Sequence, residues 1–86
     1  MRIDRLEIGM LAKSKAGHDA GHVYVILEVD DAYVYLVDGS VRTVERPKKK
    51  KKKHVQIINE KHELTGIDDV GVKRILKLFD KETGRK

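Results

Sequence analysis

The stretch that decides the fold is HVYVILEV, residues 22–29. Every second position in it is aliphatic, and successive side chains of a strand point to opposite faces of a sheet. This alternation is therefore typical of a β-strand with one face on a core. The residues expected on the core face are Val23, Val25, Leu27 and Val29. The residues expected to face outward, or toward a neighbouring element, are His22, Tyr24, Ile26 and Glu28.

Turn signals on the C-terminal side of this stretch predict two more strands. The segment DDA at 30–32 precedes the apolar segment 33–37, and the pair Asp38–Gly39 precedes the segment 41–44. Glycine tolerates the positive φ of tight hairpin turns, so Asp38–Gly39 indicates a hairpin. The three segments are expected to form a meander.

Two further apolar segments, 8–12 and 55–58, bring the expected number of short strands to about five. A chain of 86 residues has room for one small domain. So few residues, with turns at close spacing, favour a small partly open barrel over a two-sheet sandwich. The predicted fold class is mainly β.

The apolar period changes after residue 59. Residues 65–68 have the spacing of a helix capping box, although Asp68 can itself be the cap. We therefore expect a barrel over residues 1–58 and a C-terminal helical extension over residues 59–86. The apolar residues that share one face of the expected helix, at spacing i, i+3, i+4 and i+7, are Val72, Ile75, Leu76 and Phe79.

Positive charge is concentrated in one segment, residues 42–54. It holds eight Lys or Arg and one acid, a balance of +7, while the rest of the chain holds 11 basic and 13 acidic residues, a balance of −2. Six of the eight are the consecutive lysines at 48–53. A near-neutral body with one cationic strip suits a polyanion, and nucleic acid phosphates attract such a strip without regard to base sequence.

The lysine run has two interpretations. Runs of five or more like charges are commonly disordered and solvated. This run, however, lies between two segments with the apolar pattern of strands. A cationic loop tied at both ends to a sheet presents its charge at a fixed place, so we predict a basic loop over residues 46–54 that binds phosphate.

A second informative segment is the glycine loop KSKAGHDAGH, residues 13–22. Two glycines four apart between strands predict a tight loop that another molecule can approach closely. With the apolar segments 8–12 and 23–26 on either side, the loop resembles the KOW motif. Together with Asp38–Gly39 and the later basic stretch, it is most similar to a family of small large-subunit ribosomal proteins of archaea and eukaryotes. It also resembles short bacterial KOW-domain RNA-binding proteins.

The resemblance, which covers roughly residues 5–58, implies an SH3-like β-barrel that binds RNA, generally ribosomal RNA. It implies that Asp19 shapes the loop by capping backbone N–H groups. The chain has Ala20 where the motif commonly has a basic residue, which shifts weight onto the lysine run. The RNA-binding residues that the resemblance carries over are Lys13, Lys15, Gly17, His18 and Gly21. The basic strip adds Arg42, Arg46, Lys48, Lys49, Lys50, Lys51, Lys52, Lys53 and His54.

Three tyrosines leave two interpretations open. If they face outward beside the basic loops, their rings are suited to stacking on unpaired bases. The sequence favours the other interpretation, in which they are half-buried residues of the sheet. The three are Tyr24, Tyr33 and Tyr35.

The sequence argues against a metal site and against catalysis. His18 and His22 have H-x-x-x-H spacing, which brings two imidazoles to one metal only on a helix, and the neighbouring glycines oppose a helix. The aspartates at 30, 31 and 38 lie in expected turns, and the nearby hydroxyl residues have no evident base partner. We expect no catalytic residue, metal, cofactor or small-molecule substrate.

Composition indicates where the protein works. The chain has no cysteine, which is compatible with a reducing cytosol, and its longest apolar runs are far below the roughly 18 residues that span a bilayer. The residues at the N-terminus lack the apolar core of a signal peptide. We expect a cytoplasmic protein without a membrane partner.

The function predicted from sequence is non-catalytic RNA binding, directed at ribosomal RNA or the ribosome, with ribosomal proteins as possible further partners. The alternative is a protein-interaction module that docks onto ribosome or transcription components. Attachment to an anionic membrane through the polybasic segment is a weaker alternative, because no lipidation signal or membrane-seeking amphipathic helix accompanies it.

Overall fold

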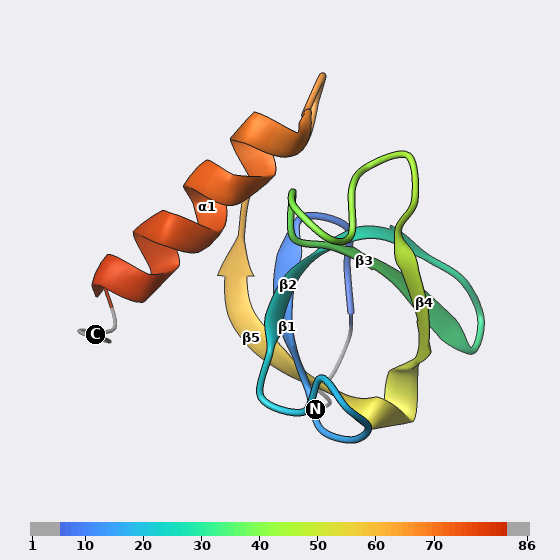
Figure 1. Ribbon diagram of the computed structural model, residues 1–86. Helices are drawn as coiled ribbons and strands as arrows, with labels where there is room; N and C mark the ends of the chain where they lie inside the picture. The colour runs from blue at the N-terminus through green and yellow to red at the C-terminus, as the bar shows by residue number, and fades with distance from the viewer. Residues whose placement is uncertain (1–5, 83–86) are drawn as a thin grey trace.

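Five antiparallel strands curl into a small, partly open SH3-like barrel, and one helix lies outside it (Figure 1). The structure is a computed structural model, and it describes residues 6–82. The mainly β fold with a C-terminal helix, predicted from sequence, is confirmed. In the sheet the strands follow the order β4-β3-β2-β1-β5. The elements are β1 (Met10–Ser14), β2 (Val23–Val29), β3 (Tyr33–Val37), β4 (Lys48–Lys51), the 3-10 helix η1 (Lys52–His54), β5 (Val55–Lys61) and α1 (Asp69–Glu82).

The sheet buries side chains on both of its faces, because the barrel interior lies on one side and α1 on the other. Residues that are neighbours in a strand enter different clusters, as the alternation of side chains requires. The buried residues of the interior are Met10, Ala12, Tyr24, Ile26, Val34, Leu36 and Val55. The buried residues between the sheet and the helix are Leu11, Val25, Val37, Val72 and Ile75.

The strand β2 differs from its predicted pattern in two ways. Tyr24 and Ile26, expected to face outward or toward a neighbouring element, are buried inside the barrel, while Val23, Val25 and Leu27 belong to the cluster between the sheet and α1. The register of β2 against β3 shifts between Ile26 and Glu28. This bulge adds one residue to β2, so Val29 packs against the interior cluster and not with the helix-facing set.

The predicted strand at 41–44 is wrong, and so is the predicted loop at 46–54. The fourth strand is β4, formed by the lysine run itself, and η1 follows it. The strand β4 pairs with β3 in the register Tyr33↔Lys51 to Leu36↔Lys48. Half of the predicted basic loop is therefore held by backbone pairing to the sheet.

Local hydrogen bonds explain why residues 41–44 do not form the strand. The Asp38 carboxylate accepts hydrogen bonds from the backbone N–H groups of Ser40 (3.0 Å) and Arg42 (2.9 Å), which turns the chain away from β3. The N–H of Val44 is donated to Asp69 of α1 at 2.9 Å. Lysines suit the position of β4 because it is an edge strand, where charged side chains discourage pairing with another chain.

The sequence left two possible starts for the helix, a capping box over residues 65–68 or Asp68 as the cap, and α1 has the second. The Asp68 carboxylate accepts a hydrogen bond from the N–H of Gly71 at 2.9 Å, so Asp68 is the N-cap. Ile67, just before the cap, packs in the same cluster as Val72, an arrangement that fixes the entry of the chain into the helix. Within residues 6–82 no helix has the length and apolarity needed to cross a membrane.

The two predicted regions, 1–58 and 59–86, share one packed structure. The strand β5 continues past residue 58 to Lys61, and α1 supplies Val72 and Ile75 to the core on the outer face of the sheet. The outermost parts of the two regions, residues 1–5 and 83–86, lie outside the described residues.

Candidate functional site

The loop between β1 and β2 folds back on itself and lies against η1. The N–H of Gly21 donates to the carbonyl of Ser14 at 2.8 Å, which closes the loop at its base. The N–H of Lys15 donates to the carbonyl of His54, also at 2.8 Å. The glycine loop and the end of the lysine run, 30 or more residues apart in the sequence, are therefore side by side (Figure 1).

Both glycines of the loop have positive φ, 90° at Gly17 and 91° at Gly21. Lack of room for a side chain is not the reason for glycine at either position. A Cβ at Gly21 would have no heavy atom within 4 Å, and one at Gly17 would make only ordinary contacts, at 3.7 Å, with Asp19 and Lys50. The backbone conformation is therefore the reason for these two glycines.

A substitution at Gly21 is expected to act through backbone strain alone. Gly21→Ala should lower the free energy of unfolding by about 1–2 kcal/mol, because alanine rarely adopts this conformation. Gly21→Asn should cost less, since asparagine visits positive φ more readily than other side chains. Urea unfolding of the two variants measures the difference. Equal losses would show that φ is not the constraint at this position.

The carboxylate of Asp19 is the centre of the polar contacts beneath the loop. It accepts hydrogen bonds from Ser14 Oγ (2.8 Å), Tyr24 Oη (2.7 Å) and Lys50 Nζ (3.3 Å), and Lys48 Nζ lies 3.7 Å away. Lys50 also donates to the carbonyl of Ala16 at 3.1 Å. Asp19 thus shapes the loop, as predicted, but its partners are side chains and not the backbone N–H groups that the resemblance implied.

The ionisation of Asp19 reflects these contacts. Burial opposes its charge, but the hydrogen bonds from Tyr24, Ser14 and Lys50, together with the charge of Lys48, outweigh burial and hold the pKa well below its ordinary value. Burial and the hydrogen bond to Asp19 raise the pKa of Tyr24 above its ordinary value. Asp19 is therefore the anion of this cluster, and Tyr24 stays a neutral donor.

The lysines of β4 divide into two sets by strand alternation. Lys48 and Lys50 are the cross-strand partners of Leu36 and Val34, whose side chains are inside the barrel. Their side chains are only 26% and 12% exposed, and both reach Asp19. We define these two as the inner lysines. Both ammonium groups are paired with the partly buried carboxylate of Asp19, a contact that the sequence did not predict.

The other lysines of β4 face outward. Lys49 and Lys51 are exposed, and they pair with Tyr35 and Tyr33 on the outer face of the barrel. The ammonium of Lys49 lies 4.4 Å from the centre of the Tyr33 ring. Lys53, on η1, is exposed as well. We define Lys49, Lys51 and Lys53 as the outer lysines; their ammonium groups are available to an anion.

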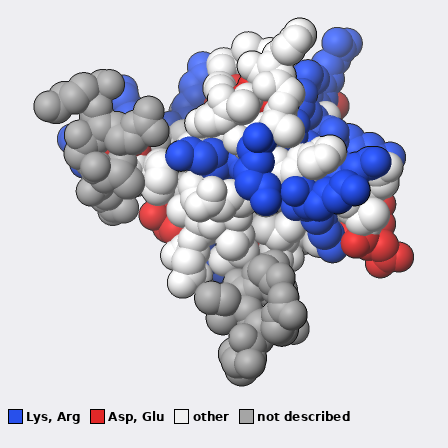
Figure 2. All heavy atoms as spheres, turned by 90° about the horizontal axis from the view of Figure 1, so that it is seen from below, with Lys and Arg blue, Asp and Glu red and all other residues white. Residues whose placement is uncertain are grey.

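Several other predicted residues lie near the glycine loop. Seen from below, Lys and Arg side chains gather in a band across one face of the molecule (Figure 2). Lys15 is exposed beside His54 of η1. His18, Arg42 and Lys48 line an open hollow of ≈ 360 Å³, and the carboxylates of Asp19 and Asp38 line it as well. Basic side chains of the loop, η1 and the segment after β3 thus share one surface with these two carboxylates.

Two predicted residues stand apart from this surface. Lys13 points to the outer face of β1 and pairs with Val23 and Gln56, so two strands separate it from β4. Arg46 is exposed in the turn before β4, where its N–H donates to the carbonyl of Thr43 at 2.9 Å. Lys13 therefore lies on the face of the sheet that packs against α1, and Arg46 lies in the turn that leads into β4.

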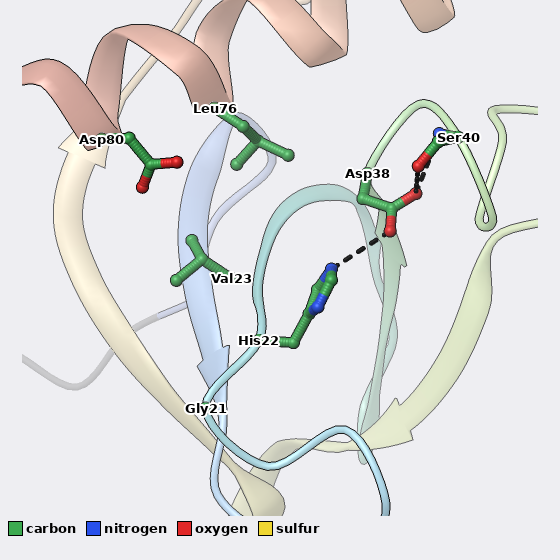
Figure 3. A pocket seen from close by; sticks show the side chains of 7 residues that line it. All are labelled: Gly21, His22, Val23, Asp38, Ser40, Leu76 and Asp80. Carbon is green, nitrogen blue, oxygen red and sulfur yellow. Dashed lines mark hydrogen bonds and ion pairs between the residues drawn. The ribbon is translucent and has the colours of Figure 1, made fainter. Parts of the chain in front are cut away.

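A second open hollow, of ≈ 320 Å³, lies between the end of the glycine loop, the end of β3 and α1. Figure 3 shows His22 pointing across it to Asp38, with Nε2 and Oδ2 3.1 Å apart. Burial opposes the charge of Asp38, but hydrogen bonds from the backbone of Ser40 and Arg42 and from His22 outweigh burial and lower its pKa. The pair joins the loop to β3.

The described residues offer no arrangement for holding a metal. Between residues 6 and 82, no three side chains of His, Cys, Asp or Glu converge on one point. His18 is exposed in the loop, while His22 is turned to Asp38. The polar groups beneath the loop, Ser14, Asp19 and Tyr24, are hydrogen-bonded to one another, which gives them a structural role.

Two groupings of side chains are not evident from the sequence. The network of Ser14, Asp19 and Tyr24 with the inner lysines joins residues from three elements, and only the i, i+2 spacing of lysines in a strand hints at it. The outer contact of Lys49 with Tyr33 depends on the lysine run being a strand. Assigning period-two alternation to residues 48–51 would have revealed both.

Comparison with known proteins adds no family to this description. A scan against protein-family models and a search of curated proteins find no match to the chain. The KOW resemblance therefore stays a prediction.

Proposed function

We propose that the protein is a non-catalytic, KOW-type RNA-binding protein that acts in the cytoplasm on ribosomal RNA or the ribosome. The observation that carries the proposal is the outward set of lysines on β4 and η1. Lys49 and Lys51 are held by backbone pairing with β3, and Lys53 follows in η1, so the charge is presented at a defined place and not on a solvated tail. Ordered cations of this kind neutralise phosphates and release condensed counterions.

The glycine loop supports the same proposal from the other side of η1. Lys15 and His54 are held together by a backbone hydrogen bond, and His18 and Arg42 share the hollow next to them. The backbone of the loop is exposed at Gly17 and Gly21, so a phosphate can approach it closely. The outer lysines and the loop together form a surface along which an RNA backbone fits.

The test compares two triple variants with the same change in net charge. Replacing the outer lysines, Lys49, Lys51 and Lys53, by glutamine should lower the slope of log affinity against log salt by about 2 for single-stranded RNA. The control replaces Lys73, Lys77 and Lys81, which are exposed on α1, and should leave the slope nearly unchanged. Salt-series titration measures both. If the two variants lose slope alike, the binding reflects net charge and not this surface.

Association with ribosomes is tested separately. After sedimentation of a cell lysate, the protein should travel with a ribosomal subunit and be released by added salt. The outer-lysine variant should remain in the soluble fraction. Wild-type protein that never sediments with a subunit would contradict the ribosomal part of the proposal while leaving RNA binding intact.

One observation favours the alternative function, docking onto a protein. The helix α1 exposes two large apolar side chains, Val70 at 63% and Leu78 at 47%, on the side away from the sheet. Apolar contacts are insensitive to salt. A protein partner bound by this face would therefore resist salt that removes RNA, and Val70→Ser with Leu78→Ser would release it.

A further inference from the structure

A third open hollow lies between the β2–β3 turn and η1. Its volume is ≈ 490 Å³. The β2–β3 turn and η1 form its walls and are held together by a hydrogen bond from the N–H of Lys52 to the carbonyl of Ala32 at 3.0 Å. The residues that line the hollow are Asp31, Ala32, Tyr33, Lys51, Lys52 and Lys53.

The chemistry of this hollow is divided between its parts. Ala32 and Tyr33 provide apolar surface, three consecutive lysines provide positive charge, and Asp31 provides a carboxylate. Tyr33 is half-buried on the outer face, and its ring is held by the Lys49 ammonium at 4.4 Å. An aromatic ring in a fixed orientation next to ordered lysines combines a stacking surface with phosphate-binding groups.

Of the three tyrosines, Tyr33 is the one suited to stacking. Tyr24 is 4% exposed, inside the barrel, and its hydroxyl is bonded to Asp19. Tyr35 pairs with Lys49 and Glu28 on the outer face and is outside the set that lines the hollow. Tyr33 and Tyr35 are half-buried residues of the sheet, as the sequence favoured. The ring of Tyr33 nevertheless lies beside the hollow.

We infer that this hollow receives one unpaired nucleobase, which stacks on Tyr33 while the phosphates beside it contact Lys51, Lys52 and Lys53. The inference rests on the proposed RNA binding and specifies its substrate as single-stranded RNA. A duplex hides the faces of its bases in its own stack, so only an unpaired base can lie on a tyrosine.

The carboxylate of Asp31 sets the orientation of the nucleotide. It repels phosphate, so the backbone of the strand lies on the lysine side of the hollow and the base lies on the side of Asp31. Base edges carry N–H donors, which a carboxylate accepts. The lining therefore combines a carboxylate with three ammonium groups, which suits an asymmetric ligand such as a nucleotide.

The test uses two short single strands that carry the same phosphates. One is an ordinary RNA strand and the other is a strand of the same length whose bases have been removed. Wild-type protein should bind the base-bearing strand about fivefold or more tightly, because one base stacked on an aromatic ring contributes roughly 1–3 kcal/mol. Both affinities should fall with added salt.

Two variants at Tyr33 assign the difference to its ring. Tyr33→Leu should bind both strands with equal affinity, whereas Tyr33→Phe, which keeps the ring, should retain the preference for the base-bearing strand. Thermal unfolding confirms that each variant is folded. If wild-type protein binds the two strands equally and with salt dependence, the base site is wrong and the proposed RNA binding stands. If it binds neither strand, both proposals fail.

Discussion

Val72→Asp is expected to leave most of the protein unfolded at room temperature. Val72 is fully buried where α1 meets the sheet, in the same cluster as Leu11, Val25 and Val37. The substitution removes about 1.5–3 kcal/mol of apolar burial and adds several kcal/mol for an unpaired buried carboxylate. The sum is comparable with the total stability of a small domain, roughly 5 kcal/mol.

The control for this prediction is Val70→Asp, two residues earlier in the same helix. Val70 is 63% exposed, and a carboxylate in the first turn is favourable at the positive end of the helix dipole. The free energy of unfolding of this variant should differ from that of the wild type by less than about 0.5 kcal/mol. Circular dichroism with urea unfolding measures both. A folded Val72→Asp protein with unchanged stability would mean that α1 does not pack on the sheet in solution.

Asp19→Asn is expected to lower the free energy of unfolding by about 2–4 kcal/mol at neutral pH. The substitution keeps the size of the side chain but removes its charge. The inner lysines, Lys48 and Lys50, would then remain largely enclosed with no counter-ion. The control is Asp31→Asn, an exposed carboxylate, which should change stability by less than about 0.5 kcal/mol.

The Asp19 prediction has a defined pH dependence. The folded-state pKa of Asp19 is lowered, so its ionised form stabilises the folded state fully above the ordinary value of 3.8. This stabilisation is lost as the pH falls from that value toward the lower folded-state pKa. The stability difference between wild type and Asp19→Asn should therefore be constant above about pH 5 and should shrink in stronger acid. A difference that grows in acid would contradict the assignment.

Local pattern was enough to predict the class of fold and much of its order. Alternation in residues 22–29 and 33–37 identified β2 and β3, because a strand with a buried face must repeat every second residue. The i, i+3, i+4, i+7 spacing from Val72 to Phe79 identified α1, and Asp68 supplied its cap. The tight loop between β1 and β2 was indicated by its two glycines, both of which have the positive φ that glycine permits.

The fourth strand shows where local pattern stopped being informative. Residues 41–44 have the composition of a strand, but the backbone N–H groups of Arg42 and Val44 donate to the carboxylates of Asp38 and Asp69. Residues 48–51 have the composition of a solvated loop, but they form backbone hydrogen bonds with β3. The inner lysines also form ion pairs with Asp19. Both outcomes depend on partners that are distant in sequence.

The sequence by itself determined the period of each element, the concentration of charge in residues 42–54 and the position of the glycine loop. Only the tertiary structure decided which lysines are available to a ligand. In a free loop all six would be equivalent, whereas pairing with β3 sends Lys48 and Lys50 inward to Asp19 and leaves Lys49 and Lys51 outside. The physical reason is that side-chain direction follows from strand pairing, and pairing is fixed by contacts between segments far apart in the chain.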